Sequence, residues 1–193
     1  MGLPARRTSV WLGIARLARF RADGLEQFGH TPQAFLNSLA PLLAFPLVSG
    51  LMTMLGGEGH YAVLNVLVSV IALLAPAVIS YYFTVAWHRE VLWLRYAIAF
   101  NWCEAAVMLT AVLMLLLPGS AMEANHAVWT GVLSAVVLLL GYWLVLHWFL
   151  VRRGLHVSVS RAVLLVVAVN IGTGLLVKGP SLLAALIGFV RGG

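Results

Sequence analysis

Glu104 is the residue of this sequence with the clearest potential for chemistry, because its carboxyl group lies inside an almost wholly apolar run. The surrounding stretch, FNWCEAAVML at residues 100–109, also holds Asn101 and Cys103. In a helix, Asn101 and Glu104 share a face, since residues three apart are neighbours on the helix surface. A carboxyl group in such a place can carry a proton, hold an ion or a polar solute, or hydrogen-bond to a neighbouring helix.

Other polar residues are expected at a comparable or smaller depth below the basic ends of their helices. At about 1.5 Å of rise per residue, Glu104 lies roughly 13 Å beyond Arg95, and Asn170 lies roughly 13 Å beyond Arg161. These positions predict a polar layer on one side of the bundle. The candidate intramembrane polar cluster consists of Asn101, Glu104, His147, Asn170 and Tyr81.

Hydrogen bonding between helices is the favoured interpretation of this cluster, with Glu104 facing the bundle interior and bonded to another member. A charged carboxylate near the bilayer centre costs about 2.5 to 3.5 kcal/mol, so it should find donors or be protonated. One alternative is a proton or ion site, or a polar cavity for a solute or lipid headgroup. Another is an oligomer contact, in which a second copy or another subunit supplies the missing donor.

The composition indicates an integral membrane protein. The chain has 193 residues, of which 62% are hydrophobic and 9% charged, whereas an ordinary soluble domain carries about 25% charge. The net charge of +6 does not indicate nucleic acid, because the basic residues form short clusters beside apolar runs. The lone Cys103 excludes an internal disulfide. No removable signal peptide is expected.

The apolar runs predict an all-α fold, a single membrane domain over residues 1–193 with a bundle of five transmembrane helices. About 20 apolar residues are needed to cross the bilayer, and the fifth run is short by that measure. Beyond it, Gly179 and Pro180 precede another apolar stretch to residue 190. We expect a Gly-Pro-broken extension, either a kinked long helix or a short span followed by an interfacial or re-entrant segment. The predicted spans are 33–55, 61–87, 92–117, 127–151 and 162–177.

The distribution of Lys and Arg predicts a cytoplasmic N-terminus and, for five spans, an external C-terminus. Ten basic residues lie before the first span or in the loops 88–91 and 152–161, or next to them, whereas only Lys178 and Arg191 fall on the other side. The two remaining loops contain no Lys or Arg.

Residues 8–21 are predicted to form a short amphipathic helix before the first span. Arg16 and Arg19 lie opposite its apolar arc, so the helix could dock on anionic lipid at the membrane surface. The alternative is a short helix that packs on the protein's own surface. The apolar arc consists of Val10, Trp11, Ile14, Leu17 and Ala18.

Three stretches resemble parts of uncharacterised multi-pass inner-membrane proteins from alphaproteobacteria. They are ARFRADGLEQFGHTPQAFLNSLAPLLAFPL, YAIAFNWCEAAVML and LHWFLVRRGLHVSVSRAVLLVVAVNIGTGLLV. These proteins resemble the five-span architecture of the Yip1-type family, which in eukaryotes is associated with membrane trafficking and small GTPases. The resemblance implies a bacterial inner-membrane location and no enzymatic site. Cys103 and Glu104 depart from the neutral polar pair expected there.

The sequence favours a non-enzymatic protein that organises lipid or partner proteins. No nucleophile motif, phosphate-binding loop or metal-binding spacing is present, and the six histidines lie mostly in or beside loops. We therefore expect no cofactor and no metal. The alternative is a small transporter or channel component that uses the polar layer. A protein partner or a second copy of the chain is left open.

Overall fold

The computed structural model describes residues 9–57, 59–116 and 126–192. Five of its helices are long and apolar enough to cross a membrane, and within the described residues no strand occurs. The predicted all-α membrane bundle of five spans is therefore confirmed. The elements are α1 (Val10–Leu17), η1 (Ala22–Gln27), α2 (Pro32–Leu55), α3 (Gly59–Ala86), α4 (Glu90–Leu116), α5 (His126–Gly154) and α6 (Val159–Gly192).

Local sequence signals explain where the helices begin and end. The Thr31 hydroxyl accepts a hydrogen bond from the Ala34 amide at 3.2 Å and caps α2, with Pro32 at the first helical position. The same helix ends at Leu55 with Gly56 as its C-cap, and Gly57 follows with a φ of 90° that favours glycine. Because such signals are local, span limits can be predicted to within a few residues.

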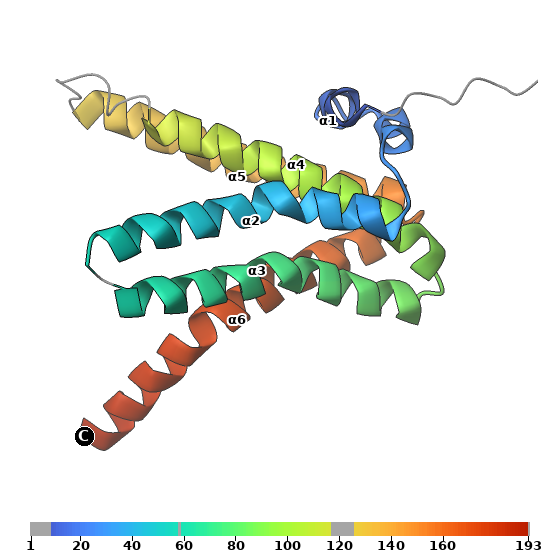
Figure 1. Ribbon diagram of the computed structural model, residues 1–193. Coiled ribbons are helices and arrows are strands. Elements are labelled where there is room, and N and C mark those ends of the chain that lie inside the picture. Colours follow the sequence, from blue (N-terminus) through green and yellow to red (C-terminus); the bar gives the residue numbers. More distant parts are fainter. Residues whose placement is uncertain (1–8, 58, 117–125, 193) are drawn as a thin grey trace, which may run out of the picture.

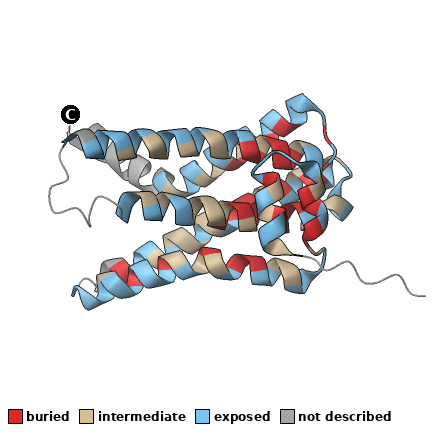
Figure 2. Cartoon of the chain, turned by 90° about the horizontal axis from the view of Figure 1, so that it is seen from above, coloured by how far each residue is buried: buried red, intermediate tan, exposed pale blue. Residues whose placement is uncertain are grey.

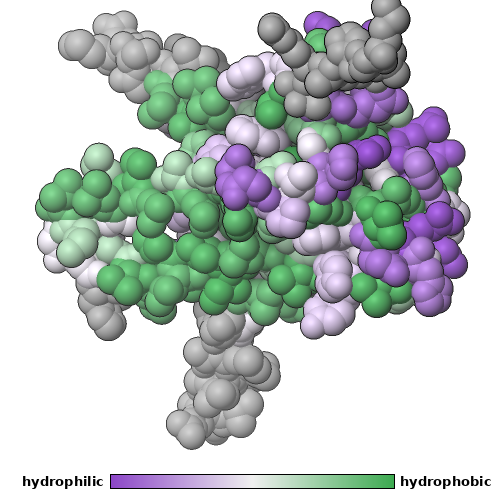
Figure 3. All heavy atoms as spheres, turned by 45° about the vertical axis from the view of Figure 1, so that its right-hand side comes forward, coloured by the Kyte–Doolittle hydropathy of each residue, from purple (hydrophilic) through white to green (hydrophobic). Residues whose placement is uncertain are grey.

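The spans pack both with neighbours in sequence and with spans further along the chain (Figure 1). α2 packs against α3 and α4, α4 packs against α5, and α6 lies against both α3 and α5. We call the end of the bundle where the chain turns at residues 28–31, 87–89 and 155–158 the basic end. Hydrophilic side chains gather at this end, whereas the helix shafts present an apolar surface (Figure 3).

The core is concentrated in the half of the bundle next to the basic end, as Figure 2 shows. The described buried residues of α4 extend no further than Ala105, and those of α6 no further than Val169. On α5 the first described buried residue is Leu146. Beyond these positions α4, α5 and α6 expose apolar side chains, so a bilayer or partner helices must cover much of their length.

The amphipathic helix is shorter than predicted, and one of its faces is buried in the protein's own core. α1 ends at Leu17, and Phe20 adopts a φ of 56° before η1 begins. The Phe20 ring packs edge-on against Tyr142 and Phe149 of α5, so the chain turns here and a single helix over residues 8–21 is wrong. Leu17 is fully buried.

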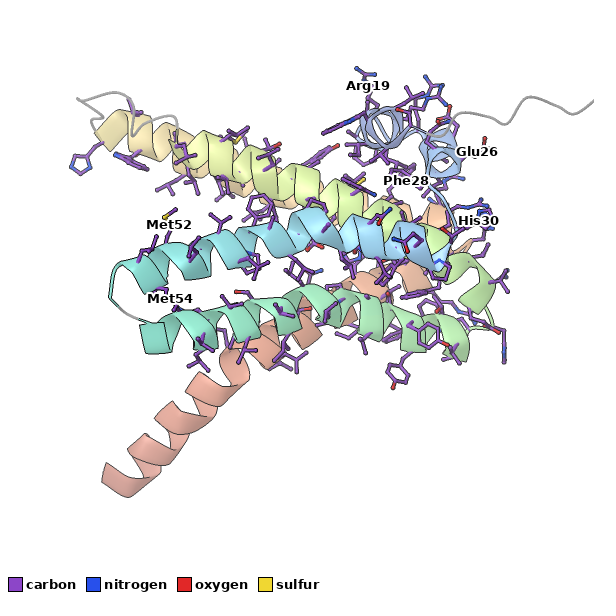
Figure 4. All side chains as sticks on the ribbon, viewed as in Figure 1. Arg19, Glu26, Phe28, His30, Met52 and Met54 are labelled. Carbon is purple, nitrogen blue, oxygen red and sulfur yellow. The ribbon has the colours of Figure 1, made fainter. Side chains whose placement is uncertain are left out.

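The outward side of α1 differs from its buried side. Trp11 is 76% exposed, and Figure 4 shows Arg19 pointing away from the bundle, whereas Phe28 lies beneath this segment in the core. The alternative of packing on the protein's own surface therefore describes one face of α1. The other face is exposed, and its docking on lipid stays a prediction.

Of the two alternatives for the segment after Gly179 and Pro180, the structure has the single long helix. α6 is one helix from Val159 to Gly192 and passes through both residues. A proline removes one amide donor from a helix but leaves the hydrogen bonds on either side of it in place. Prolines within membrane helices are tolerated for this reason, and the long-helix alternative is the one that the structure adopts.

Candidate functional site

Asn101 joins α4 to α2 through a buried hydrogen bond. Its Nδ2 donates to the Ser38 Oγ at 2.9 Å, and both residues are almost inaccessible. The Ser38 hydroxyl in turn donates to the Phe35 carbonyl at 2.7 Å. The Asn101 amide and the Ser38 hydroxyl thus each have a partner, and this part of the predicted cluster links two helices.

His147 joins α5 to α4 in a second and separate pair. Its Nε2 lies 3.2 Å from the Tyr96 hydroxyl, with both side chains buried. The Phe100 ring lies 4.7 Å from the imidazole between centroids, and the Trp143 ring stacks on it at 5.9 Å. The imidazole is thus enclosed by aromatic rings and a single polar partner, which is a packed arrangement rather than an open site.

Glu104 faces the bundle interior, as predicted, but it lacks the predicted donor. It lies one helical turn after Phe100, which contacts α5, and three residues after Asn101, which contacts α2. Its Oε2 atom is buried and has no hydrogen-bond partner within the described part of the chain. The prediction of a direct hydrogen bond to Glu104 from another cluster member is therefore wrong, because Asn101, His147 and Asn170 bond elsewhere and Tyr81 lies on the bundle surface, whereas a bond bridged by one water stays a prediction.

Asn170 and Tyr81 do not belong to an interior cluster. Val169 of α6 is buried, which turns Asn170 outward, and its amide donates to the Val166 carbonyl of its own helix at 2.8 Å. Tyr81 is 44% exposed, with its ring centroid 5.1 Å from that of Trp93 on the bundle surface. The predicted polar layer therefore exists as separate pairs and two outward-facing residues.

Thr173 is an interior residue that was not included in the predicted cluster. Its Oγ1 is buried and, within the described residues, has no hydrogen-bond partner. Thr173 lies 14 residues after Val159 at the start of α6, and Glu104 lies 14 residues after Glu90 at the start of α4. The sequence alone shows that Thr173 and Glu104 lie equally far along their helices. It does not show that both side chains point inward, because that depends on how the helices pack.

The main apolar grooves lie on the outside of the bundle and do not reach Glu104. One, of about 430 Å³, runs between α1, α2 and α4 and is lined by residues such as Trp11, Pro41 and Trp102. Another, of about 410 Å³, is lined by Phe35, Tyr81 and other side chains of α2, α3 and α4. Their apolar walls suit acyl chains or the side chains of a partner helix.

Metal chemistry has no support in the part of the chain that the structure describes. No group of three or more His, Cys, Asp or Glu residues there could hold a metal ion.

Comparison with known proteins adds no assignment: no protein-family model, curated protein or solved structure matches the chain.

Proposed function

We propose that this multi-pass membrane protein is a non-enzymatic component of the bacterial inner membrane that organises lipid or partner proteins. Its basic end faces the cytoplasm in this proposal, in keeping with the bias of Lys and Arg. The observation that carries the proposal is the contrast between a closed half at the basic end and apolar outer faces beyond it. The resemblance to Yip1-type proteins points the same way.

The packed half of the bundle argues against a conduit. Tyr96, Ile98 and Leu150 are buried there together with His147, and the polar groups of Asn101 and His147 are held by direct protein partners. A transporter needs a wet path between these helices in at least one of its states. A closed core at this level instead provides a rigid base for surfaces that bind in the plane of the membrane.

The buried Glu104 oxygen supports a partner that enters the membrane. A buried acceptor without a donor costs about 1 to 3 kcal/mol, and Glu104 lies where the core of α4 ends, next to Ala105. A donor on a partner segment inserted between the outer halves of the helices would remove this cost. Binding of a proton or an ion at the same atom would instead support the alternative function, a small transporter or channel component.

Affinity purification in a mild detergent tests the leading proposal. We expect a stoichiometric protein or lipid to accompany the wild-type chain and to be reduced by Glu104→Leu. Thr130→Val is the matched control, because the Thr130 hydroxyl is exposed, donates to the His126 carbonyl of its own helix and lies away from both grooves. Purification of the chain alone, with no retained lipid, would contradict an organising role.

Ion flux into proteoliposomes tests the alternative. If Glu104 carries protons or ions, the wild-type chain conducts them and Glu104→Gln abolishes the flux without changing stability. If the chain organises partners, neither protein conducts. If the wild-type chain conducts ions and also purifies without a bound protein or lipid, the transport function replaces our proposal.

A further inference from the structure

The arginines of the basic end differ in whether they already have a partner. Asp23 of η1 accepts from Arg16 at 3.3 Å and from Arg21 at 3.1 Å. Two of the positive charges attributed to the amphipathic segment are therefore shared with a carboxylate of the protein itself. This pairing weakens the case for α1 as the principal site for an anionic group.

Two further arginines are held against aromatic rings. The Arg152 guanidinium lies 5.4 Å from the centre of the Trp148 ring, and the Arg161 guanidinium lies 5.6 Å from that of Trp87. Such contacts anchor the cation against the ring face. The Arg161 contact links the start of α6 to the end of α3, whereas the Arg152 contact lies within α5.

Arg95 and Arg153 have no such partner and line the same cleft. The cleft has a volume of about 420 Å³ and lies between η1, the first turns of α4 and the end of α5, with His156 also in its wall. The structure shows no hydrogen bond or ion pair for Arg95 or Arg153 within the described residues. Two unpaired guanidinium groups therefore lie around one hollow.

The wall of the cleft is fixed by the core beneath it. A Cβ atom at Gly154 would lie 3.3 Å from the Tyr96 Cβ, so the end of α5 lies directly against α4. This approach brings Arg153, which precedes Gly154, to the same cleft as Arg95, which precedes Tyr96. The arrangement does not depend on a flexible loop.

The backbone at His156, in the turn between α5 and α6, is also fixed. Its backbone adopts a φ of 51°, a left-handed conformation in which histidine is more frequent than most residues. Leu155 and Val157 on either side are buried in the core. The turn between α5 and α6 is therefore fixed, and the imidazole adds a hydrogen-bonding group to a wall already formed by the two arginines.

We propose that this cleft binds the phosphodiester of a membrane lipid in the leaflet at the basic end. Guanidinium groups bind phosphate oxygens through paired N–H donors. The two carboxylates of the lining, Asp23 and Glu26, both have interaction partners. A phosphodiester carries a single negative charge, which the two guanidinium groups can bind through paired donors.

The position of the cleft favours a lipid over a soluble phosphate. Leu25 and Leu92 contribute apolar surface beside the charged groups, as a glycerol and the first acyl carbons require. Arg95 lies five residues into α4, about 8 Å from its start, where the basic ends of the spans meet the headgroup region. The inference gives a site to the lipid-organising part of the proposed function and rests on that function.

Lipid binding to the full-length chain in neutral detergent tests the site, with phosphatidylglycerol as the probe and native mass spectrometry as the readout. We expect the double variant R95Q/R153Q to bind at least about tenfold more weakly, since a hydrogen bond to a charged group is worth about one such factor. The control R19Q/R89Q removes the same charge from exposed positions outside the cleft. It should change the affinity by less than about twofold at physiological salt, where distant charges are screened.

Each other outcome has a defined meaning. Equal losses in both double variants would show a general field and overturn the site, as would unchanged binding in R95Q/R153Q. Inorganic phosphate that binds the wild-type chain as tightly as the lipid does would replace the lipid by a soluble phosphate. Co-purification of a partner protein with R95Q/R153Q, despite lost lipid binding, would leave the organising role intact and separate the two proposals.

A measurement on the wild-type chain covers the case in which the variant fails to fold. Phenylglyoxal modifies accessible arginines, and bound phosphatidylglycerol should protect Arg95 and Arg153 while leaving Arg19 and Arg89 reactive. Protection of all four to the same extent, or of none, would overturn the proposal.

Discussion

The hydrogen bond between Asn101 and Ser38 should contribute measurably to the stability of the bundle. Ser38→Ala removes the acceptor 2.9 Å from the Asn101 Nδ2 and leaves that buried donor without a partner. An unsatisfied buried donor costs about 1 to 3 kcal/mol. Asn101→Ala removes the donor instead, and the Ser38 hydroxyl keeps its bond to the Phe35 carbonyl. The two single variants should therefore lose stability for different reasons, but both lose the same hydrogen bond.

A double-mutant cycle isolates that shared interaction. Interhelical hydrogen bonds in membranes average about 0.6 kcal/mol and reach about 1.7 kcal/mol. The Asn101–Ser38 bond belongs in the upper part of this range, because both residues are almost fully buried and the serine has a second bond. We expect Ser38→Ala/Asn101→Ala to be less destabilised than the sum of the single variants by about 1 kcal/mol.

The measurement is the free energy of unfolding in bicelles, obtained by steric trapping. Ser134→Ala is the matched control, because the exposed Ser134 hydroxyl donates to the Thr130 carbonyl within its own helix. It should shift the free energy by only a few tenths of a kcal/mol. If the costs of the two single variants add to within about 0.3 kcal/mol, the bond makes no net contribution and our account of the α2–α4 contact is wrong.

Three further predictions concern packing, charge and topology. A Cβ atom at Gly50 would collide with Val66 of α3, so Gly50→Ala should destabilise the α2–α3 hairpin by about 1 to 3 kcal/mol, whereas Gly141→Ala, with no neighbour within 4 Å, should be neutral or stabilising in thermal melts. Glu104→Leu should stabilise the isolated chain by about 1 kcal/mol or more, since it removes a buried acceptor without a donor; a loss of stability would reveal a partner group. An alkaline phosphatase fused after Arg191 should be active, as expected for an external C-terminus, and a reporter active there only in the cytoplasm would reverse the proposed orientation.

The spans could be predicted because they depend on the bilayer and on local signals. Apolar length, the cap at Thr31 and the glycines at 56 and 57 act within a few residues of each helix end. The turn at Phe20 could not be predicted in this way. It depends on Tyr142 and Phe149, more than 100 residues away in the chain, which provide the surface on which the aromatic ring packs.

The pairing of side chains in the candidate site could not be predicted from the sequence, and the geometry of a helix explains why. Depth rises steadily along the chain, so one basic anchor is enough to place a residue along the bilayer normal. Direction around the helix changes by about 100° with each residue, and it becomes fixed only when the helices pack. Asn170 was matched to Glu104 in depth, but the inward position of Val169 turns it away. Thr173, one turn after Val169 on the inward face, has the inward-facing oxygen instead.

The same geometry explains why a partner for Glu104 should come from outside the chain. The nearby donors of Asn101 and His147 are engaged with Ser38 and Tyr96, and both bonds help to close the packed half of the bundle. A rotation of α4 large enough to bring Glu104 to His147 would break the Asn101–Ser38 bond that links α4 to α2. The bundle therefore keeps its interhelical bonds and leaves the Glu104 oxygen unmatched at the edge of the core. A donor or a proton that reaches this edge after folding would bind without disturbing the packed half.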